Sequence, residues 1–363
     1  MRERARSTRT REDLTRQLSP LREERDFFAD PPENGLEFAV TPHYLSLIRG
    51  DSDDPIRTQC IPRIDETRVL PYESSDPLDE LSFSPAPRLV HRYADRTLLL
   101  VTDECAVYCR HCFRRHFSGG RRGAITPGEL REVAAYLASH REVKELLLSG
   151  GDPLTLADGR LRAVLEAVRG ARPDIVLRLA TRMPVVLPSR ITTGLAKLLA
   201  DYAPLFLVTQ YNHPAELEEQ SSAALRKITR AGTPVLNQAV LLRGVNDDPV
   251  VLEELFHLLS ARQVFSYYLF QGDLAAGTSH LRVPLSEGLS IVRSLRQRLS
   301  GIAMPVYAVD LPGGGGKIPL TESYLLGAES SRTTGDPAGS GQSGAGGSPS
   351  ARQSRFAGLR VFR

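Results

Sequence analysis

The sequence predicts an α/β fold, a partial (β/α) barrel of about six parallel strand–helix units, with a helical or irregular N-terminal extension. Short, continuously apolar runs recur from residue 98, and after the first gap their spacing is about 30 residues, the length of one strand–helix unit. Amphipathic helical patterns lie between these runs, which is typical of parallel strands with helices outside. Six or more such units favour a barrel over an open sheet.

The elements follow one another in a regular order. Thr126 and Pro127 predict the start of a helix that runs to about His140, because a threonine cap followed by proline is a common helix opening. Later helices are expected to open at Pro188, Pro214 and Pro249. The predicted strands are 98–101, 145–148, 175–179, 205–208, 235–241 and 265–270, with a last strand near 306–309.

Composition divides the chain into four parts. Residues 1–35 form a polar leader, which we expect to be partly disordered. Residues 36–95 are rich in proline and should form an extension that packs on the core. Residues 96–327 should form the barrel. Residues 328–363 consist largely of Gly, Ser, Ala and Arg. Such a segment has too few apolar groups to offset the entropy of ordering, so a disordered tail is predicted.

The overall charge and hydropathy exclude several classes of protein. A net charge of +3 is too small to indicate a nucleic-acid or membrane partner. No apolar run approaches the length of a membrane span, and no apolar N-terminal segment resembles a secretory signal. The cytoplasm is therefore the expected compartment. In such a chain, clustered cysteines bind metal more often than they form disulfides.

Polar residues end or follow six consecutive predicted strands. The carboxyl ends of barrel strands meet on one face, and polar groups are costly to bury without partners. We therefore expect one common pocket there. In strand order the residues are the cysteine cluster, 149–153, Thr181 with Arg182, Gln210 with Asn212 and His213, Asn237 with Gln238, and Gln271 with Asp273.

Three of the four cysteines have the spacing C-x3-C-x2-C, at Cys105, Cys109 and Cys112. Three thiolates on one loop can ligate three irons of a four-iron cubane, leaving the fourth iron open to a small molecule. A zinc site is the alternative, with His111 or His116 as fourth ligand, but structural zinc sites favour paired C-x2-C elements. The fourth cysteine, Cys60, is expected to be a buried apolar residue.

The cysteine motif and its neighbours resemble the lysine 2,3-aminomutase family of radical S-adenosylmethionine enzymes. The resemblance covers roughly residues 36–326. The motifs that carry it are Arg92 and Arg96, Cys109-Arg-His-Cys112-Phe-Arg114-Arg115, Ser149-Gly-Gly-Asp-Pro, Pro184-Val-Val-Leu-Pro188, Asn237-Gln-Ala-Val-Leu-Leu-Arg-Gly-Val-Asn246 and Asp310-Leu-Pro-Gly-Gly-Gly-Gly-Lys317.

This resemblance implies three cofactors: a [4Fe–4S] cluster, S-adenosylmethionine and pyridoxal phosphate. In the family an electron from the cluster cleaves S-adenosylmethionine, and the resulting 5′-deoxyadenosyl radical takes hydrogen from the β-carbon of an amino acid held on pyridoxal phosphate. The nitrogen then moves from Cα to Cβ. The implied partners are the amino acid substrate, a flavodoxin- or ferredoxin-type electron donor and further copies of the chain in a homo-oligomer.

The resemblance also implies roles for individual residues. Lys317 would carry pyridoxal phosphate, and the glycines at 313–316 let the backbone approach a cofactor closely. Arg92 and Arg96 would hold its phosphate, a task that suits guanidinium donors, and two surface arginines are the alternative. Arg114 would bind the substrate carboxylate. The S-adenosylmethionine contacts would be Gly150, Gly151, Asp152, His213 and Gln238, although Asp152 could instead cap a turn and His213 could be a core histidine.

Two aspartates bear on the choice of substrate. By the resemblance, Asp273 and Asp310 together would hold the ε-ammonium of lysine, which implies conversion of L-lysine to β-lysine. Alternatively, Asp273 caps a helix and Asp310 pairs with an arginine. Arginine or glutamate as substrate, or a lysine aminomutase that serves elongation factor P, remain open. A non-catalytic iron–sulfur protein is the alternative of another class.

The sequence departs from the longer lysine enzymes in one respect. Those enzymes have a C-terminal set of zinc-binding cysteines, and one partner cysteine follows the Arg-Gly-Val-Asn stretch. Here Asp248 stands at that position, and no cysteine follows Cys112. No structural zinc is therefore expected.

Overall fold

The computed structural model describes residues 7–32, 35–120, 122–321, 325–328, 354–356 and 359–361. Two compact units divide the chain, Met1–Leu320 and Thr321–Arg363. In the second unit three short strands form an antiparallel sheet in the order β10 (Leu325–Ala328), β12 (Leu359–Val361), β11 (Ser354–Phe356). The remainder of the predicted 328–363 tail lies outside the described residues, so its disorder stays a prediction.

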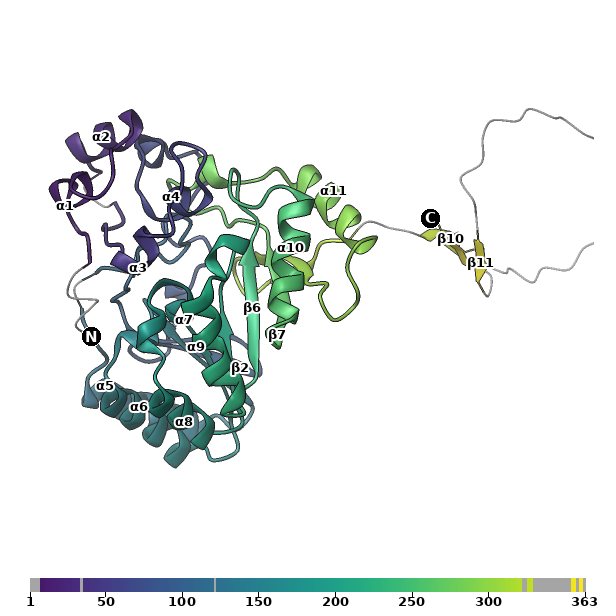
Figure 1. The fold of residues 1–363 in the computed structure, drawn as a ribbon. Helices are drawn as coiled ribbons and strands as arrows, with labels where there is room; N and C mark the ends of the chain where they lie inside the picture. The colour runs from purple at the N-terminus through teal and green to yellow at the C-terminus, as the bar shows by residue number, and fades with distance from the viewer. Residues whose placement is uncertain are drawn as a thin grey trace, which may run out of the picture. The chain divides into compact units, whose positions relative to one another are not determined.

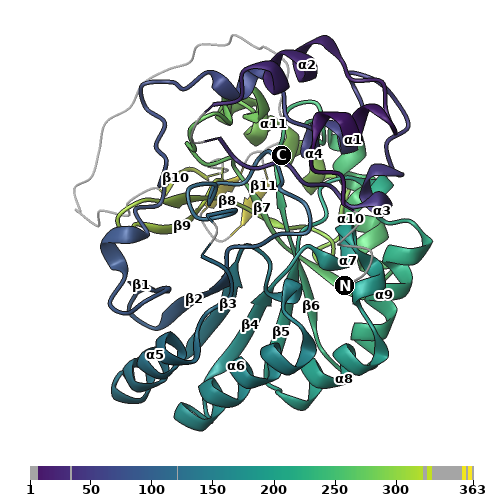
Figure 2. The ribbon, with the colours of Figure 1, turned by 90° about the vertical axis from the view of Figure 1, so that its left-hand side faces the viewer.

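A nine-stranded sheet forms the framework of the first unit, in the simple order β1 to β9. Strands β2 to β8 are parallel, and β1 and β9 pair antiparallel at the two edges. Figure 2 shows this sheet curving as a partial barrel, which confirms the predicted fold class. The strands are β1 (Leu89–Tyr93), β2 (Arg96–Thr102), β3 (Glu145–Gly150), β4 (Val176–Ala180), β5 (Leu205–Thr209), β6 (Val235–Val240), β7 (Val264–Phe270), β8 (Val306–Leu311) and β9 (Gly316–Pro319).

One helix of eight or more residues follows each parallel strand except the last, which gives the six predicted strand–helix units. Each helix buries its apolar face, as Val133 and Leu137 show in the first. Burial of such a face supplies most of a helix's stability in a protein. These helices are α5 (Pro127–Ser139), α6 (Asp158–Ala171), α8 (Thr193–Asp201), α9 (Glu219–Arg230), α10 (Pro249–Ser260) and α11 (Leu285–Arg296).

Two of the four predicted helix starts are right. Thr126 caps α5 by accepting from the Glu129 backbone N–H, and Pro249 is the first residue of α10. The predictions at Pro188 and Pro214 were wrong, because each proline opens a 3₁₀ turn, Pro188–Arg190 and Pro214–Glu216. The helices begin later, where Thr192 caps α8 and Glu218 caps α9. A side chain that accepts from the first-turn N–H groups thus decides the boundary, not the proline.

The N-terminal part is more regular than its composition indicates. Figure 1 shows its short helices gathered together, in purple and blue. Leu14 and Phe27, in the described part of the leader, are buried in the first unit. The helices are α1 (Arg11–Thr15), α2 (Arg22–Ala29), α3 (Pro42–Leu45) and α4 (Pro55–Cys60), followed by the 3₁₀ turns Ile64–Thr67 and Leu81–Phe83.

Side chains bridge the two edges of the sheet. Arg92 on β1 donates to Asp310 on β8 at 2.5 Å, and the neighbouring Tyr93 hydroxyl donates to the same carboxylate oxygen at 3.0 Å. A β-carbon at Gly314, in the turn between β8 and β9, would lie 3.3 Å from the Arg92 carbonyl oxygen. The predicted cofactor residues Arg92 and Lys317 therefore lie where the barrel would otherwise be open.

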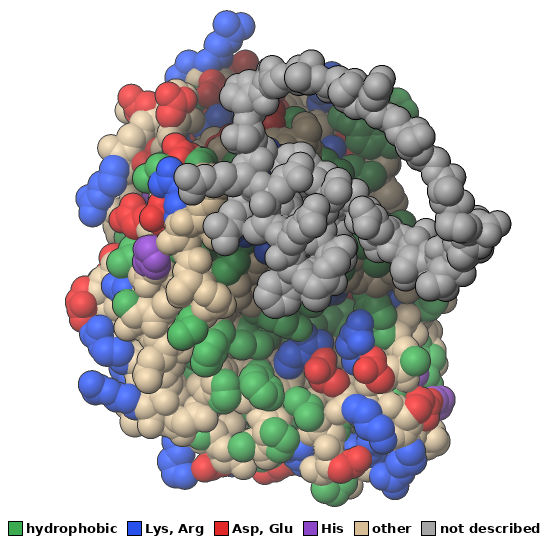
Figure 3. Space-filling model, turned by 90° about the vertical axis from the view of Figure 1, so that its right-hand side faces the viewer, with side chains coloured by type: hydrophobic (Ala, Val, Ile, Leu, Met, Phe, Trp, Pro, Cys, Tyr) green, Lys and Arg blue, Asp and Glu red, His purple; other side chains and the backbone are tan. Residues whose placement is uncertain are grey.

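The surface of the described residues carries scattered large hydrophobic side chains, among them Leu81, Phe265 and Ile302. On the face in Figure 3, hydrophobic side chains gather next to Lys or Arg side chains that alternate with Asp or Glu. Within the described part of the chain, no helix combines the length and apolar character needed to cross a membrane.

Candidate active site

A cavity of about 520 Å³ extends into the barrel from the carboxyl ends of the strands. This cavity is the common pocket that the sequence predicts, and it brings together all but one of the predicted site residues. The exception is His213, which is not among the lining residues. The predicted residues that line it are Arg92, Arg96, Cys105, Cys109, Cys112, Arg114, Gly150, Gly151, Asp152, Gln238, Asp273, Asp310 and Lys317.

The three clustered cysteines lie on the loop between β2 and α5. The Cys112 backbone N–H donates to the Cys109 carbonyl oxygen at 3.0 Å, which turns the loop so that all three residues reach the cavity. Burial, followed by the nearby Cys109, raises the pKa of the Cys112 thiol. Cys60 is fully buried in the main core, as predicted. Its thiol donates to the Ile56 carbonyl oxygen at 3.2 Å.

A buried arginine anchors the cysteine loop. Arg110 donates two hydrogen bonds to the Glu66 carboxylate, at 2.7 and 2.6 Å, and a third to the Glu37 carbonyl oxygen at 2.8 Å. Arg115 donates to the same carboxylate at 2.5 Å. Although burial alone would raise the pKa of Glu66, the two guanidinium groups hold it below its ordinary value. The N-terminal extension thus holds the loop at one residue within the cluster motif and at one residue after it.

Gly150, the last residue of β3, and Gly151 after it are required by the close approach of the chain that leads into the cysteine loop. A β-carbon at Gly150 would lie 2.2 Å from the Thr102 carbonyl oxygen, and one at Gly151 would lie 2.3 Å from the Glu104 carbonyl oxygen. Gly150 also has a φ of 126°, which L side chains rarely adopt. The close approach here is therefore between β3 and the start of the cysteine loop, a packing role that sequence reasoning did not foresee.

Asp152 joins the ends of β3 and β4. One carboxylate oxygen accepts from the Leu154 backbone N–H at 3.0 Å and from the Thr181 hydroxyl at 2.7 Å. The other accepts from the Arg182 backbone N–H at 2.8 Å. Burial raises the pKa of this carboxyl. These contacts match the alternative in which Asp152 caps a turn, while its place in the cavity wall keeps it available to a cationic ligand.

Lys317 and Asp310 are partners across the β8–β9 hairpin. The Lys317 Nζ donates to Asp310 Oδ2 at 2.5 Å, and Arg92 donates to the other oxygen of this carboxylate. The lysine amine also lies 5.7 Å from the ring centre of Tyr93 and 5.6 Å from that of Phe270. Asp310 therefore pairs with an arginine, as in the alternative to substrate binding. The same carboxylate also pairs with Lys317.

Arg96 and Arg114 have different surroundings. The Arg96 guanidinium lies 3.9 Å from the centre of the Tyr93 ring and donates to Asp95 at 2.8 Å. Arg114 donates two hydrogen bonds to the buried Glu80 carboxylate, both at 2.7 Å. Sequence reasoning missed Glu80, because the residue lies in the irregular segment 34 positions before its partner. The Arg114 Nη1 also donates to the Ser149 hydroxyl, at 3.2 Å.

Asp273 is an acid of the cavity with a raised pKa. Burial, followed by the negative charge of Asp310, raises the pKa of Asp273 to about 7. Within the described part of the chain no hydrogen bond to this carboxylate is present, and its backbone carbonyl accepts from Arg282 instead. The Asp273 carboxyl group therefore lines the cavity and has no ion-pair partner among the described residues.

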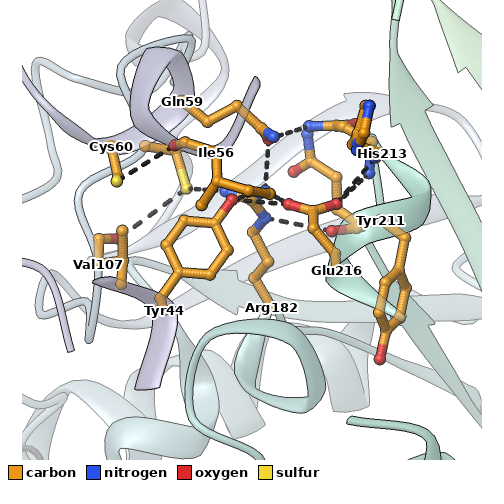
Figure 4. A network of polar contacts seen from close by, with 12 residues as sticks. Tyr44, Ile56, Gln59, Cys60, Val107, Arg182, Tyr211, His213 and Glu216 are labelled. Atoms are coloured by element: carbon orange, nitrogen blue, oxygen red, sulfur yellow. Dashed lines mark hydrogen bonds and ion pairs between the residues drawn. The ribbon is translucent and has the colours of Figure 1, made fainter. Parts of the chain in front are cut away.

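His213 belongs to a polar network beside the cavity (Figure 4). Its Nδ1 accepts from the Ala215 backbone N–H at 3.1 Å, and its own backbone N–H donates to Glu216. Burial lowers the pKa of this imidazole. These contacts favour the alternative of a structural histidine. The network also contains Arg182, which sequence reasoning noted as polar but gave no role.

The cysteine loop resembles no single-ion site. Within the described ranges, no group of three or more His, Cys, Asp and Glu side chains is placed to hold one metal ion. His111, one of the two possible zinc ligands, is half-buried, and its Nε2 lies 3.0 Å from the Gln210 amide nitrogen. Thiolates that bind three different irons need not converge on one point.

Comparisons with known proteins find two matching family models and several similar enzymes. The family model for the radical SAM superfamily matches residues 99–256, and the model for lysine-2,3-aminomutase matches residues 292–334. An L-lysine 2,3-aminomutase of Fusobacterium nucleatum is 42% identical over 316 residues, 87% of this chain and 74% of that protein. One of Clostridium subterminale is 41% identical, over 87% of this chain and 76% of that protein.

One further relative and one solved structure are similar to the chain at lower identity. A glutamate 2,3-aminomutase of Clostridioides difficile is 37% identical over 86% of this chain and 74% of that protein. A radical SAM methyltransferase structure from Sphaerobacter thermophilus is 20% identical, covers 62% of this chain and 69% of that one, and has a TM-score of 0.46. Relatives above 40% identity over most of both chains show that this chain belongs to the lysine 2,3-aminomutase family of radical S-adenosylmethionine enzymes, and that it is an isomerase of a class that uses a [4Fe–4S] cluster and S-adenosylmethionine.

Proposed function

We propose that this enzyme moves the α-amino group of L-lysine to the β-carbon, with pyridoxal phosphate as third cofactor. The observation that carries the proposal is the meeting of Lys317, Asp310 and Asp273 with the three clustered cysteines in one cavity. A cavity with only a cluster site would not need a lysine between two aromatic rings and two acids at the other wall.

Cys105, Cys109 and Cys112 are the proposed cluster ligands. They lie on one loop, reach one cavity, and are held by the Arg110–Glu66 pair behind them. When bound, the cluster supplies the electron that cleaves S-adenosylmethionine, and a reduced flavodoxin or ferredoxin is the proposed source of that electron. Gly150, Gly151, Asp152 and Gln238 form the adjacent wall, where we place S-adenosylmethionine.

The opposite wall fits pyridoxal phosphate. Lys317 has a side chain that is 26% exposed, so its amine can reach a ligand in the cavity. Arg92 and Arg96 flank Tyr93 on the same wall, and guanidinium groups suit a phosphate. When bound, this cofactor holds the substrate nitrogen during its migration. The protein's part is to fix the lysine on a hairpin and to surround it with ring faces that exclude water.

The remaining groups fit both ends of a lysine molecule. Arg114 lies beside the cluster ligand Cys112 and is the proposed partner of the α-carboxylate. At the far end, Asp310 already holds an amine of the same chemistry, the Lys317 ammonium at 2.5 Å. Asp273 adds a second carboxylate with no fixed cation. Burial of an unpaired charge is strongly unfavourable, so two acids select a cationic substrate end.

Glutamate fits this pocket less well, since its side-chain carboxylate would face Asp273 and Asp310. Arginine is a stronger competitor, because two carboxylates can accept a guanidinium. The decisive experiment uses anaerobically reconstituted enzyme with S-adenosylmethionine, pyridoxal phosphate and a strong reductant. Each of the three amino acids is incubated separately, and the α- and β-isomers are separated. We expect β-lysine and no β-glutamate. β-Glutamate as the main product would refute the lysine assignment, and β-arginine would redirect it.

A further inference from the structure

Arg182 is a buried arginine that contacts a proposed cluster ligand directly. It follows β4 and precedes the short helix α7 (Met183–Val186), and its side chain points into the network of Figure 4. Its Nη1 donates to the Cys109 Sγ at 2.9 Å. Its Nε donates to the Gln210 carbonyl oxygen at 3.1 Å. An arginine in this position places a permanent positive charge next to one sulfur of the cysteine loop.

The rest of the guanidinium is fixed by side chains from three separate segments. Its Nη2 donates to Glu216 at 2.5 Å, to Gln59 at 2.5 Å and to the Tyr44 hydroxyl at 3.0 Å. Tyr44 in turn donates to Glu216 at 2.6 Å. All four side chains are buried. Arg182 therefore cannot swing away from Cys109 without breaking several buried hydrogen bonds, each costly to leave unmade.

The acid of the network is itself held in place. One oxygen of Glu216 accepts from Arg182 and Tyr44, and the other accepts from the backbone N–H groups of Asn212 at 2.6 Å and His213 at 3.0 Å. Glu216 partly balances the charge of Arg182 at a fixed position. At Cys112 the thiol has a longer side-chain contact, with the uncharged Ser118 hydroxyl at 4.0 Å.

We infer that Arg182 is a positioning residue that stabilises the Cys109 thiolate and thereby raises the reduction potential of the cluster, while Glu216 limits the size of this effect. Reduction adds one electron to the cluster. The proposed flavodoxin or ferredoxin supplies this electron, and no proton or ligand is exchanged. Because the reduced cluster is more negative, a cation and an N–H donor at a ligand sulfur stabilise it relative to the oxidised form. The inference rests on the proposed ligand set.

The test is a redox titration of the reconstituted enzyme, followed by electron paramagnetic resonance, with iron content measured on each sample. Arg182→Gln removes the charge, and Arg182→Lys keeps it without the planar fork. Glu216→Gln removes the balancing negative charge and leaves Arg182 in place. Arg172→Gln is the matched control, since Arg172 is fully buried but donates to the backbone carbonyls of Leu137, His140 and Val143, away from the cysteine loop.

In Arg182→Gln we expect the ratio of reduced to oxidised cluster at a fixed potential to fall about tenfold. For a one-electron couple this equals a shift of the midpoint potential by about 59 mV to more negative values. Glu216→Gln should shift the midpoint in the opposite direction, and Arg182→Lys should shift it less than Arg182→Gln. The Arg172→Gln control should match the wild type. If Arg182 and Glu216 had only a structural role, Arg182→Gln and Glu216→Gln would not shift the midpoint potential in opposite directions.

Two kinds of failure can be told apart. Unchanged midpoints in Arg182→Gln and Glu216→Gln, with full iron content, would overturn the inference and leave the ligand set intact. If Arg182→Gln does not fold, the signs measured for Arg182→Lys and Glu216→Gln decide the question. A full cluster in Cys109→Ala would instead refute the ligand set, and with it the basis of the inference.

Discussion

The charged residues of the cavity are not in equivalent states. Asp310 has two cations within hydrogen-bonding distance, Arg92 and Lys317, so its negative charge is balanced. Asp273 lies near the same groups without a direct hydrogen bond, and its pKa is raised to about 7 by burial and by Asp310. A substrate ammonium would therefore interact most strongly with Asp273, the acid that gains most from a new positive charge.

This difference predicts a pH dependence of lysine binding. The ionised fraction of Asp273 rises with pH through about 7, because its pKa is raised, and only the ionised form attracts an ammonium. Since one pH unit below a pKa leaves about a tenth of a carboxyl group ionised, lysine affinity should fall nearly tenfold from pH 8 to pH 6. Calorimetry of lysine binding checks this. In Asp273→Asn the affinity should be weaker at pH 8 and flat with pH; a flat wild-type profile would contradict the role of Asp273.

The attachment of pyridoxal phosphate to Lys317 is tested covalently. Borohydride reduction of the loaded enzyme, followed by peptide mapping, should mark Lys317, and Lys317→Ala should abolish the label. Lys197→Ala is the control, because Lys197 is exposed and pairs only with the nearby Asp201 at 2.9 Å. A label on another lysine would show that the last motif has been aligned wrongly.

At the residue scale, the sequence predicts which groups share the cavity better than it predicts their partners. The motifs identify Arg114, but not that Glu80 binds it, because Glu80 lies in an irregular segment with no periodic pattern. The roles predicted for Asp152 and His213 involve ligands, whereas the structure also gives both residues backbone N–H partners. Such local caps depend on the turn geometry and cannot be distinguished from ligand contacts by residue type alone.

At the element scale, the end of β3 lies close to the end of β2 and to the start of the cysteine loop. The backbone there leaves no room for a β-carbon at Gly150 or Gly151. The three-cysteine loop is therefore held by the β3 turn on one side and by Arg110 on the other. Its shape depends on the strand next to it as much as on its own sequence.

Gly150→Ala should consequently destabilise both the fold and the cluster. The added methyl would meet the Thr102 carbonyl oxygen, and the residue would keep an unfavourable φ, so we expect a loss of at least about 2 kcal/mol in the free energy of unfolding. Iron content after reconstitution should fall as well. Urea unfolding and iron analysis measure these effects. Gly159→Ala is the control, because nothing lies within 4 Å of a β-carbon there, and its stability should stay within about 1 kcal/mol of the wild type.

The predicted elements were right where apolar runs repeat and incomplete where they do not. All seven parallel strands were predicted within two residues at each end, since each contains a short apolar run and all but the last are followed by a helix. The edge strands β1 and β9 were missed. β1 lies in a proline-rich segment, and β9 begins at the last of four consecutive glycines, three of which have positive φ. Both strands are specified by pairing with a neighbour, which has no local signature.

At the scale of the whole molecule, the N-terminal segments are structural parts of the first unit. Residues of α3 and α4 reach the Arg182 network through Tyr44 and Gln59, and the turn Ile64–Thr67 supplies Glu66 to the cysteine loop. Among the contacts that join the leader to the extension is a buried ion pair between α2 and α4. In that pair Glu24 accepts from the Arg57 Nε and Nη2, both at 2.7 Å, and both side chains are buried.

This ion pair allows a test of whether the leader belongs to the folded unit. Removing one partner of a buried pair leaves an uncompensated charge, so Glu24→Gln should lower the free energy of unfolding by about 3–5 kcal/mol. Replacing both partners by apolar residues of similar size, Glu24→Leu with Arg57→Met, should recover most of this loss, because no charge is then left buried. Asp201→Asn, which breaks the exposed pair with Lys197, should cost less than about 1 kcal/mol. Urea unfolding measures all three. Wild-type stability in Glu24→Gln would mean that the leader does not dock on the extension, since an unpaired Arg57 would then be free to reach water.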